Sequence, residues 1–309
     1  MTSLDGKVAI VTGAGAGVGQ AIAHRLAASG AYVVVNDIDG ISARRVGAAL
    51  SEAGSAVAVV IGSVAIPKTA VEMVQAARDR WGRLDILVNS ANVSRDAMIH
   101  LLPDEWFAVM MDVTVKGTFQ CIRAAAPLMC TVANSDRSVD QRVRRKIVNI
   151  ASTAGIYGAA GKVAYAAATA AVIGMTKTVA KEWAPFLVNC NAVAPGLISP
   201  RRETANSVTD SVLLVQTMPT QGATQEYRLE SLPPEFTATM SELGSLPETT
   251  TSFAIDVSNK PAHPMPWGRI GTPDDVAGAV AFLVGPDSDF ITGTVLEVHG
   301  GMESVSSGR

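Results

Sequence analysis

Charged residues, cysteines and long apolar runs are all scarce in this chain of 309 residues. Charged residues make up 17% and hydrophobic residues 48%, a balance that is typical of a well-packed globular protein and excludes a disordered one. The net charge is -3, so no basic field favours nucleic acid binding. Cys121, Cys130 and Cys190 are odd in number and have no metal-ligand spacing, so we interpret them as reduced thiols.

Two further absences concern membranes and targeting. No uninterrupted apolar run reaches the roughly 18 residues of a membrane span. The first residues lack the charged-then-apolar pattern of a signal peptide. We therefore expect a cytoplasmic protein that binds a small molecule, with neither a membrane nor a metal ion as partner.

What the chain does contain is a regular alternation of short apolar runs and longer helical patterns. Runs that are apolar throughout are typical of a parallel sheet covered on both faces, and the alternation indicates right-handed crossovers in a doubly wound α/β fold. Strands are predicted at 8–11, 32–35, 56–61, 84–88, 147–151, 188–193 and 295–298. Helices are predicted at 18–29, 41–53, 69–81, 104–129, 163–184 and 274–284.

Two segments interrupt this alternation, so we predict a single domain over 1–309 with insertions at about 131–145 and 201–266. The first is polar and contains Arg137, Arg142, Arg144 and Arg145, which favours a solvated loop over a docking site for an acidic partner. The second is rich in Thr, Ser, Pro and Glu and follows a strand's carboxyl end. It is interpreted as a substrate lid or oligomer contact, the alternative being an insertion without a role.

A glycine-rich sequence joins the first predicted strand to the first predicted helix. Its glycines permit a tight turn and a close approach of the backbone to a pyrophosphate, which the N–H groups at the helix start would bind. Asp37 ends the second strand, where a carboxylate accepts hydrogen bonds from ribose hydroxyls and repels a 2′-phosphate. The pattern predicts NAD rather than NADP; the alternative for Asp37 is a turn acid beside Asn36 and Asp39. The predicted phosphate-binding residues are Thr12, Gly13, Gly15, Gly17, Val18 and Gly19.

Together with further motifs, this loop makes the chain resemble the short-chain dehydrogenase/reductase family along nearly its whole length. The motifs lie at 12–19, Asn89, 149–152, Tyr165, 191–196, 268–273 and 291–293, with Gly300 and Gly301. The resemblance implies a seven-stranded Rossmann sheet and a homodimer or homotetramer. It also implies cofactor contacts from Ser63, Val64, Asn89, Ala91, Pro195, Gly196 and Ile198.

In the family, a serine positions the substrate oxygen, a tyrosine transfers the proton, and a lysine lowers the tyrosine pKa and binds the nicotinamide ribose. Ser152 and Tyr165 occupy the first two positions, thirteen residues apart. The lysine position, four residues after the tyrosine, holds Thr169. The asparagine that holds a relay water in the family is replaced by Thr114.

Three more positions depart from the family pattern: Asn92 stands for a glycine, Pro200 for the threonine at the nicotinamide amide, and Ser63 for the acid at the adenine. Four of the five departures lie toward the nicotinamide, while the phosphate loop and Asp37 are kept. We therefore expect a preserved nucleotide-binding half that faces an altered reaction half.

A threonine hydroxyl supplies no field comparable to an ammonium, so removing the lysine is expected to slow proton transfer by on the order of a hundredfold or more. Lys162 and Lys116 are candidates to replace it, the alternative being solvated surface lysines. His100 and Tyr157 are expected near the cleft mouth, and His299 in a structural or oligomer contact.

Three functions remain open from the sequence. The first is NAD(H)-linked oxidoreduction of a carbonyl or hydroxyl group through the altered site. The second is non-redox chemistry, as a cyclase, lyase, dehydratase or isomerase, for example in biosynthesis, with Ser152 and Tyr165 polarising a carbonyl. The third is a catalytically silent subunit that pairs with an active relative in a hetero-oligomer.

Overall fold

Seven parallel strands form the centre of the structure, a computed structural model that describes residues 3–136, 144–199 and 266–302. The order across the sheet is β3-β2-β1-β4-β5-β6-β7, and every pairing is parallel. The strands are β1 (Val8–Val11), β2 (Tyr32–Asp37), β3 (Val57–Ile61), β4 (Ile86–Asn89), β5 (Arg145–Ile150), β6 (Val188–Pro195) and β7 (Val295–Val298). The predicted seven-stranded, doubly wound sheet is confirmed.

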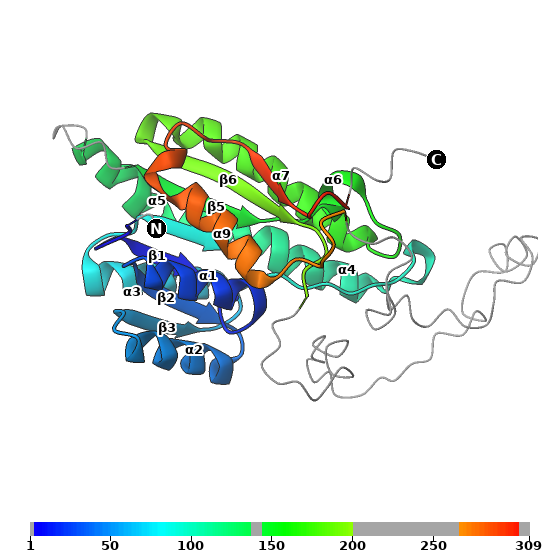
Figure 1. Cartoon of the computed structure of the whole chain (residues 1–309), viewed down its shortest axis with the longest axis horizontal. Coiled ribbons are helices and arrows are strands. Elements are labelled where there is room, and N and C mark those ends of the chain that lie inside the picture. Colours follow the sequence, from blue (N-terminus) through cyan, green and yellow to red (C-terminus); the bar gives the residue numbers. More distant parts are fainter. Residues whose placement is uncertain (1–2, 137–143, 200–265, 303–309) are drawn as a thin grey trace, which may run out of the picture. The chain divides into compact units, whose positions relative to one another are not determined.

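Helices cover both faces of this sheet, because successive apolar residues of a strand point to opposite sides (Figure 1). In β2, Val33 and Val35 join one core cluster and Val34 joins the other. The first cluster includes α1 (Gly17–Ala28), α2 (Gly40–Glu52) and α9 (Pro273–Val284). The second includes α3 (Pro67–Trp81), α5 (Gly117–Asp136) and the end of α7 (Val163–Trp183). A strand sequence without a polar face is thus explained by burial on both sides.

The carboxyl ends of all seven strands point to one edge of the sheet. β1 lies between β2 and β4, so the chain winds in one direction from β1 to β3 and in the other from β4 to β7. Open α/β sheets bind ligands in the crevice at such a reversal, since the loops on either side diverge to opposite faces. The fold therefore predicts a ligand site at the loops that follow β1 and β4.

The long helix predicted at 104–129 is present but not regular. It runs as α4 (Asp104–Met110), a π-helical turn η2 (Met111–Lys116) and α5, which continues to Asp136. A π turn inserts one extra residue per turn and is frequent at functional sites. Because η2 contacts α7, the irregular turn faces the helix that carries Tyr165.

The predicted insertion at 131–145 is wrong at both ends. Residues 131–136 continue α5, and Arg145 begins β5, where it is 1% exposed. Residues 137–143 lie outside the described part of the chain. Charge misled the prediction: Arg145 is a buried strand residue, and Arg144 forms an ion pair with Asp289, so these two residues are not part of a solvated loop. Lys146, the next residue, is buried in the same strand.

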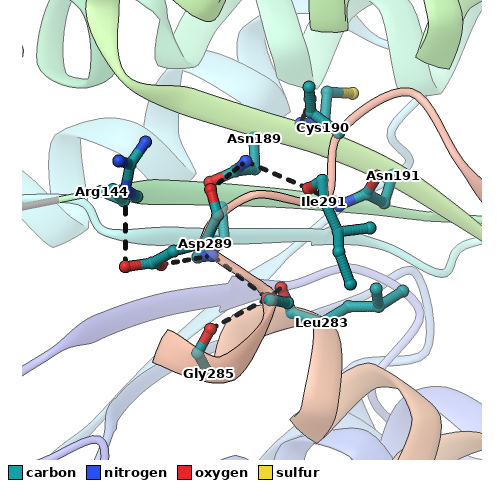
Figure 2. Close-up of polar contacts among 11 residues, drawn as sticks. Arg144, Asn189, Cys190, Asn191, Leu283, Gly285, Asp289 and Ile291 are labelled. Carbon is teal, nitrogen blue, oxygen red and sulfur yellow. Dashed lines mark hydrogen bonds and ion pairs between the residues drawn. The ribbon is translucent and has the colours of Figure 1, made fainter.

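A polar cluster at the amino-terminal end of β5 accounts for the buried lysine. Lys146 Nζ lies 2.8 Å from Asp289 Oδ1 and 3.1 Å from Ser288 Oγ. Figure 2 shows Asp289 between Arg144, at 3.4 Å, and Asn189, whose amide donates to the Asp289 carbonyl at 3.1 Å. Burial lowers the pKa of Lys146, and the hydrogen bond and charge of Asp289 partly offset this effect. The cluster fixes the turn after α9 to strands β5 and β6.

The three cysteines are free, as the sequence indicated. Burial raises the pKa of Cys121 and of Cys190 to about 12 and also raises that of Cys130. Thiols of this kind behave as small apolar core residues rather than nucleophiles.

One stretch of the described chain, Val163–Phe186, is long and apolar enough to cross a membrane by composition alone. It contains the whole of α7, which packs against β6 and the short helix α6 (Ala154–Tyr157). A helix that lies along a sheet needs the same apolar composition, so a single such segment is weak evidence for a membrane span.

Residues 201–265 of the predicted 201–266 insertion, and with them its predicted role as lid or oligomer contact, lie outside the described residues.

Removing Asp289 should expose the cost of the buried Lys146 charge. We expect Asp289→Ala to lower the free energy of unfolding by about 2 kcal/mol, less than for a fully buried pair because the Asp289 side chain is 40% exposed. In a Lys146→Met background the same change should cost under about 1 kcal/mol, since no buried cation is then left unpaired. Urea unfolding of the four proteins measures the coupling; equal costs in both backgrounds would contradict it.

Candidate active site

The loop after β1 lies directly against the loop after β4, at the reversal point of the sheet. Gly13 has φ +62°, and a Cβ added there would lie 2.8 Å from Ala91 Cα. At Gly19 a Cβ would overlap the carbonyl oxygen of Gly13. Only glycine fits these two positions, because any side chain would collide with backbone rather than with a flexible neighbour.

In front of α1 the same loop has open space. Gly17, at φ +54°, has no atom within 4 Å of the place where a Cβ would stand, and the N-cap residue Ala16 gives no side-chain hydrogen bond to the helix. The first N–H groups of a helix have no partners within the helix, and its dipole favours an anion at that end. The close-packed glycines and the open helix end together form a cradle that suits a phosphate group.

Thr12 fastens the two loops together. Its Oγ1 accepts hydrogen bonds from the backbone N–H groups of Ser90 and Ala91, each at 3.0 Å. Thr12 is 1% exposed, and the donor residues Ser90 and Ala91 are partly buried. The predicted residues Thr12 and Ala91 are therefore brought together, and one hydroxyl holds the path of the chain after β4.

Asp37 lies beside the glycine-rich loop, as predicted. Its Oδ2 accepts from Gly15 N at 2.9 Å, and its Oδ1 accepts from Asp39 N at 3.0 Å. A Cβ on Gly15 would lie 2.8 Å from Oδ2, so the missing side chain at Gly15 allows this approach. Each carboxylate oxygen has a further lone pair with which to accept a hydrogen bond.

The neighbouring strand end carries Ser63 and Val64, both predicted contacts of the nucleotide. Ser63 Oγ accepts from Ala65 N at 3.2 Å and closes a short turn after β3. Val64 is buried, and a Cβ on Gly117 at the start of α5 would lie 2.5 Å from its Cγ2. Both residues lie at the same sheet edge as Asp37, one strand further out.

A buried amide network holds the ends of β4 and β5 at a fixed spacing. Asn89 Nδ2 donates to Asn149 Oδ1 at 2.8 Å, and Asn149 Nδ2 donates to Thr176 Oγ1 of α7 at 2.9 Å. Asn89 Oδ1 is buried and has no hydrogen-bond partner within the described structure. The network ties α7, and with it Tyr165, to the strands that carry Asn89 and Ser152.

Ser152 and Tyr165 lie on opposite sides of α6 along the chain. Ser152 directly follows Ala151 after β5, is 8% exposed, and its Oγ accepts from Ala154 N at 3.2 Å. That bond uses a lone pair of the oxygen and leaves the hydroxyl hydrogen free to donate. Tyr165 is half-buried on α7, and its phenolic oxygen accepts from Asn92 Nδ2 at 3.2 Å.

Thr169 and Thr114 differ in what their hydroxyls do. Thr169 is fully buried, and its Oγ1 donates to the backbone carbonyl of Tyr165 at 2.8 Å. A Cβ on Gly155 would lie 2.5 Å from this oxygen, so α6 packs closely over it. Thr114 lies in the π turn, is 1% exposed, and its Oγ1 has no partner within the described residues.

The structure also places the two lysines named as possible substitutes. Lys162 Nζ lies 2.5 Å from Asp96 Oδ2 and 5.9 Å from the ring centroid of Tyr165. Lys116 Nζ lies 3.2 Å from Asp112 Oδ1, one helical turn away, and both side chains are about half exposed. Of the two lysines, Lys162 is therefore the one that contacts the tyrosine ring.

The end of β6 completes the edge. Pro195 O accepts from Thr153 N at 3.0 Å, which links the segment after Ser152 to β6. A Cβ on Gly196 would lie 2.7 Å from His299 Cβ, and Ile198 forms an isolated bridge with Gly271. Pro200 lies outside the described residues.

The structure also places three further candidates from the sequence: His299, Tyr157 and His100. His299 Nδ1 accepts from Gly301 N at 3.1 Å, and its Nε2 lies 3.3 Å from Glu297 Oε2. Tyr157 is 53% exposed and donates to the same carboxylate at 2.9 Å. His100 lies in an exposed 3₁₀ turn after β4.

Sequence reasoning missed the contact between Asn92 and Tyr165. Asn92 was recognised as a departure from a pattern, but no local signal relates it to a tyrosine 73 positions later. The pairing of Lys162 with Asp96, 66 positions apart, was missed for the same reason.

The chain is similar to known dehydrogenases and reductases. Residues 7–210 match the family described as short chain dehydrogenase, and residues 214–303 match the one described as Enoyl-(Acyl carrier protein) reductase. The chain belongs to the short-chain dehydrogenase family. The family's first match spans β1 to the end of β6, so it includes the glycine-rich loop, Ser152 and Tyr165.

Individual members of the short-chain dehydrogenase family match over nearly their full length. A 3-oxoacyl-(acyl-carrier-protein) reductase of Vibrio cholerae is 32% identical over 97% of this chain and 98% of its own. A human (3R)-3-hydroxyacyl-CoA dehydrogenase is 31% identical over 97% and 96%. Among solved structures, a gluconate 5-dehydrogenase of Burkholderia cenocepacia, in complex with NADP and tartrate, aligns with a TM-score of 0.71 at 25% identity, over 98% of this chain and 97% of that one.

Substitution of Thr12 tests the two hydrogen bonds from Ser90 N and Ala91 N to Thr12 Oγ1, which we call the Thr12 clamp. In Thr12→Val the two N–H groups of Ser90 and Ala91 lose their acceptor while the side-chain shape is kept. We expect the free energy of unfolding to fall by about 2–3 kcal/mol, because two buried donors are left unpaired. Thr12→Ser keeps the oxygen and should cost under about 1 kcal/mol. Chemical denaturation of the three proteins measures this, and equal losses in both variants would contradict the role of the hydroxyl.

Proposed function

We propose that the protein is an oxidoreductase that interconverts a carbonyl and a hydroxyl group of a small molecule, with NAD(H) as cofactor. The observation that carries the proposal is the position of Tyr165: its phenolic oxygen is held at 3.2 Å by Asn92, on the loop that the Thr12 clamp fixes against the glycine-rich cradle. A proton-transferring group beside a phosphate cradle is the arrangement that hydride transfer to a dinucleotide requires.

The residues present fit a nicotinamide dinucleotide. The open start of α1 would take the pyrophosphate, Asp37 would accept from the adenosine ribose, and Ser63 and Val64 would line the adenine. Asn89, whose Oδ1 is buried without a partner in the described structure, and Ala91 would follow the central part of the cofactor, with Pro195, Gly196 and Ile198 at the nicotinamide amide. The bound nicotinamide accepts or supplies the hydride.

Protein groups handle the proton. In reduction, Ser152 donates its free hydroxyl hydrogen to the carbonyl oxygen, and the Tyr165 O–H bond breaks as the new substrate O–H bond forms. Alcohol oxidation runs in reverse, and Tyr165 Oη receives the proton. Thr169 cannot assist as a lysine would, since its hydroxyl is neutral and bonds the backbone. Thr114 Oγ1, which has no partner among the described residues, is available to hold a buried water in a proton relay.

The relatives suggest which substrates to try first. Their names describe a 3-oxoacyl-(acyl-carrier-protein) reductase and a (3R)-3-hydroxyacyl-CoA dehydrogenase, which act on a carbonyl or hydroxyl group. We propose 3-oxoacyl and 3-hydroxyacyl thioesters as the first members of a broader ketone and alcohol panel. A cytoplasmic location remains our expectation. We also expect a homodimer or homotetramer, which is supported by exposed aromatic side chains on α4 and α5, Trp106, Phe107 and Phe119.

Tyr165 and Thr169 give the test of this function. We expect turnover of the wild-type protein with NADH or NAD⁺, and a loss of at least about a hundredfold in kcat for Tyr165→Phe, because the proton has no other route. Thr169→Lys should raise the rate of alcohol oxidation by about tenfold or more, since an ammonium favours the phenolate. Spectrophotometric assay of NADH measures both. Absence of turnover in the wild type and in Thr169→Lys, across the whole panel, would overturn the proposal.

Asp37 decides the choice of dinucleotide in this proposal. A carboxylate that faces the ribose accepts from the 2′-hydroxyl of NADH and repels the 2′-phosphate of NADPH. We expect NADH to bind at least about tenfold more tightly than NADPH, and Asp37→Ser should reduce that ratio by about tenfold. Fluorescence titration with both dinucleotides measures this; an NADPH preference in the wild type would refute the assignment, as would an unchanged ratio in the variant.

A non-redox reaction is the second candidate, because Thr169 and Thr114 replace the groups nearest the proton route while Ser152 and Tyr165 are kept. In that case both hydroxyls would polarise a carbonyl as hydrogen-bond donors. Product formation that consumes stoichiometric NADH or NAD⁺ excludes this reaction. A silent partner subunit, the third candidate, is excluded if Tyr165→Phe changes any activity of the isolated chain.

A further inference from the structure

We propose that Asn92 is a positioning residue for Tyr165, and that its side-chain amide stabilises the phenolate in place of the cation that Thr169 cannot supply. The proposal rests on the proposed use of Tyr165 as proton donor and acceptor. It starts from one contact: Asn92 Nδ2 lies 3.2 Å from Tyr165 Oη. Among the described residues, Asn92 is the one whose side chain forms a hydrogen bond with this oxygen.

The loop that carries Asn92 is anchored at both ends. Directly before Asn92, the backbone is fixed by the hydrogen bonds of Ser90 and Ala91 to Thr12. Five residues after it, Ala97 N donates to Gly161 O at 2.8 Å and Ala97 bridges Lys162, directly before α7 begins. The amide is therefore placed by the same two anchors that fix the cradle and the start of the tyrosine helix, and it needs little reorganisation to act.

Other polar groups near the tyrosine are bonded to atoms other than its phenolic oxygen. The Thr169 hydroxyl donates to Tyr165 O and also approaches Ala166 O, at 3.2 Å. Lys162 lies against the ring rather than the oxygen, at 5.9 Å from the centroid, and is paired with Asp96. An ammonium paired with a carboxylate gives a weaker net field than a free one. The direct contact of Asn92 is thus the best-placed support for a negative charge on the phenolic oxygen.

An amide suits both protonation states of a phenol. Its carbonyl oxygen accepts from a neutral hydroxyl, and its NH₂ group donates to a phenolate. In alcohol oxidation the substrate O–H bond breaks and the Tyr165 Oη–H bond forms, so the phenolate that Asn92 stabilises is the proton acceptor. A hydrogen bond to a charged oxygen is roughly twice as strong as one between neutral groups, so donation favours the ionised state.

The test must separate Asn92 from the charged groups on the elements around Tyr165. Lys162 stands at the start of α7, and Asp96 lies on the same loop as Asn92. The elements packed against α7 carry the pair Asp112 and Lys116 on η2, Asp104 and Glu105 on α4, and Glu297 bonded to Tyr157 of α6. None of these charges changes when Asn92 is substituted, so a substitution series at this one position isolates the amide.

The test follows the ionisation of Tyr165 without substrate or cofactor, using the full chain. Near-ultraviolet absorbance of tyrosinate is titrated with pH, and the curve of Tyr165→Phe is subtracted. We expect Asn92→Leu, which removes the donor, to raise the ionisation midpoint by about one pH unit. Asn92→Asp, of equal shape but with a negative charge at neutral pH, should raise it further.

Ser94→Ala is the matched control, because Ser94 lies on the same loop and bonds Asp96 but not the tyrosine. We expect its midpoint to equal that of the wild type. Unchanged midpoints in both Asn92 variants, with thermal melting showing that they fold, would overturn the proposal, as would equal shifts in Ser94→Ala and Asn92→Leu. Because the titration needs no turnover, a shift in the Asn92 variants supports the proposal even if the panel of substrates shows no activity.

If the protein turns over, the pH–rate profile provides a second readout. The limb that reports the ionised tyrosine in alcohol oxidation should move to higher pH in Asn92→Leu by about the same amount as the absorbance midpoint. Lower rates at every pH, without movement of this limb, would mean that Asn92 only supports the loop, and would overturn the proposal.

Discussion

The bond between the loops after β1 and β4 is the constraint on which the rest of the site depends. One hydroxyl, on Thr12, satisfies two backbone N–H groups that would otherwise be buried without a partner. The Gly13 backbone can then approach Ala91 so closely that no side chain fits between them. This contact sits where the winding of the sheet reverses, so it determines both the shape of the phosphate cradle and the path of the segment that carries Asn92. The proposed nucleotide site and the proposed proton donor are thereby held by the same interaction.

The buried polar residues differ between the two ends of the sheet: ion pairs lie at one end, and amides and hydroxyls lie at the other. At the amino-terminal end of β5, Lys146 and Arg144 both form ion pairs with Asp289. At the carboxyl edge, neutral amides and hydroxyls predominate around the tyrosine, and two of them, Asn89 Oδ1 and Thr114 Oγ1, have no partner in the described structure. Unpaired buried polar atoms cost stability, and such atoms occur where a ligand or a water completes the bonding.

Thr169 and Asn92 have defined contacts next to Tyr165. The Thr169 hydroxyl bonds the helix backbone, and α6 packs over it. Asn92, which the sequence presents only as a substituted glycine, fills space next to the phenol with a hydrogen-bond donor.

The sequence by itself determined the fold and the nucleotide end of the site, because both depend on local patterns. Runs of β-branched residues without a polar face specify buried parallel strands, and glycines at fixed spacing specify a loop that only glycine can form. Local charge misled it at Arg145, which it assigned to a loop although this residue lies buried in β5. Only the tertiary structure decided which polar group meets Tyr165, whether Lys162 is free, and where the Thr169 hydroxyl points. These outcomes depend on contacts between residues tens of positions apart, and such contacts leave no trace in the spacing of neighbours along the chain.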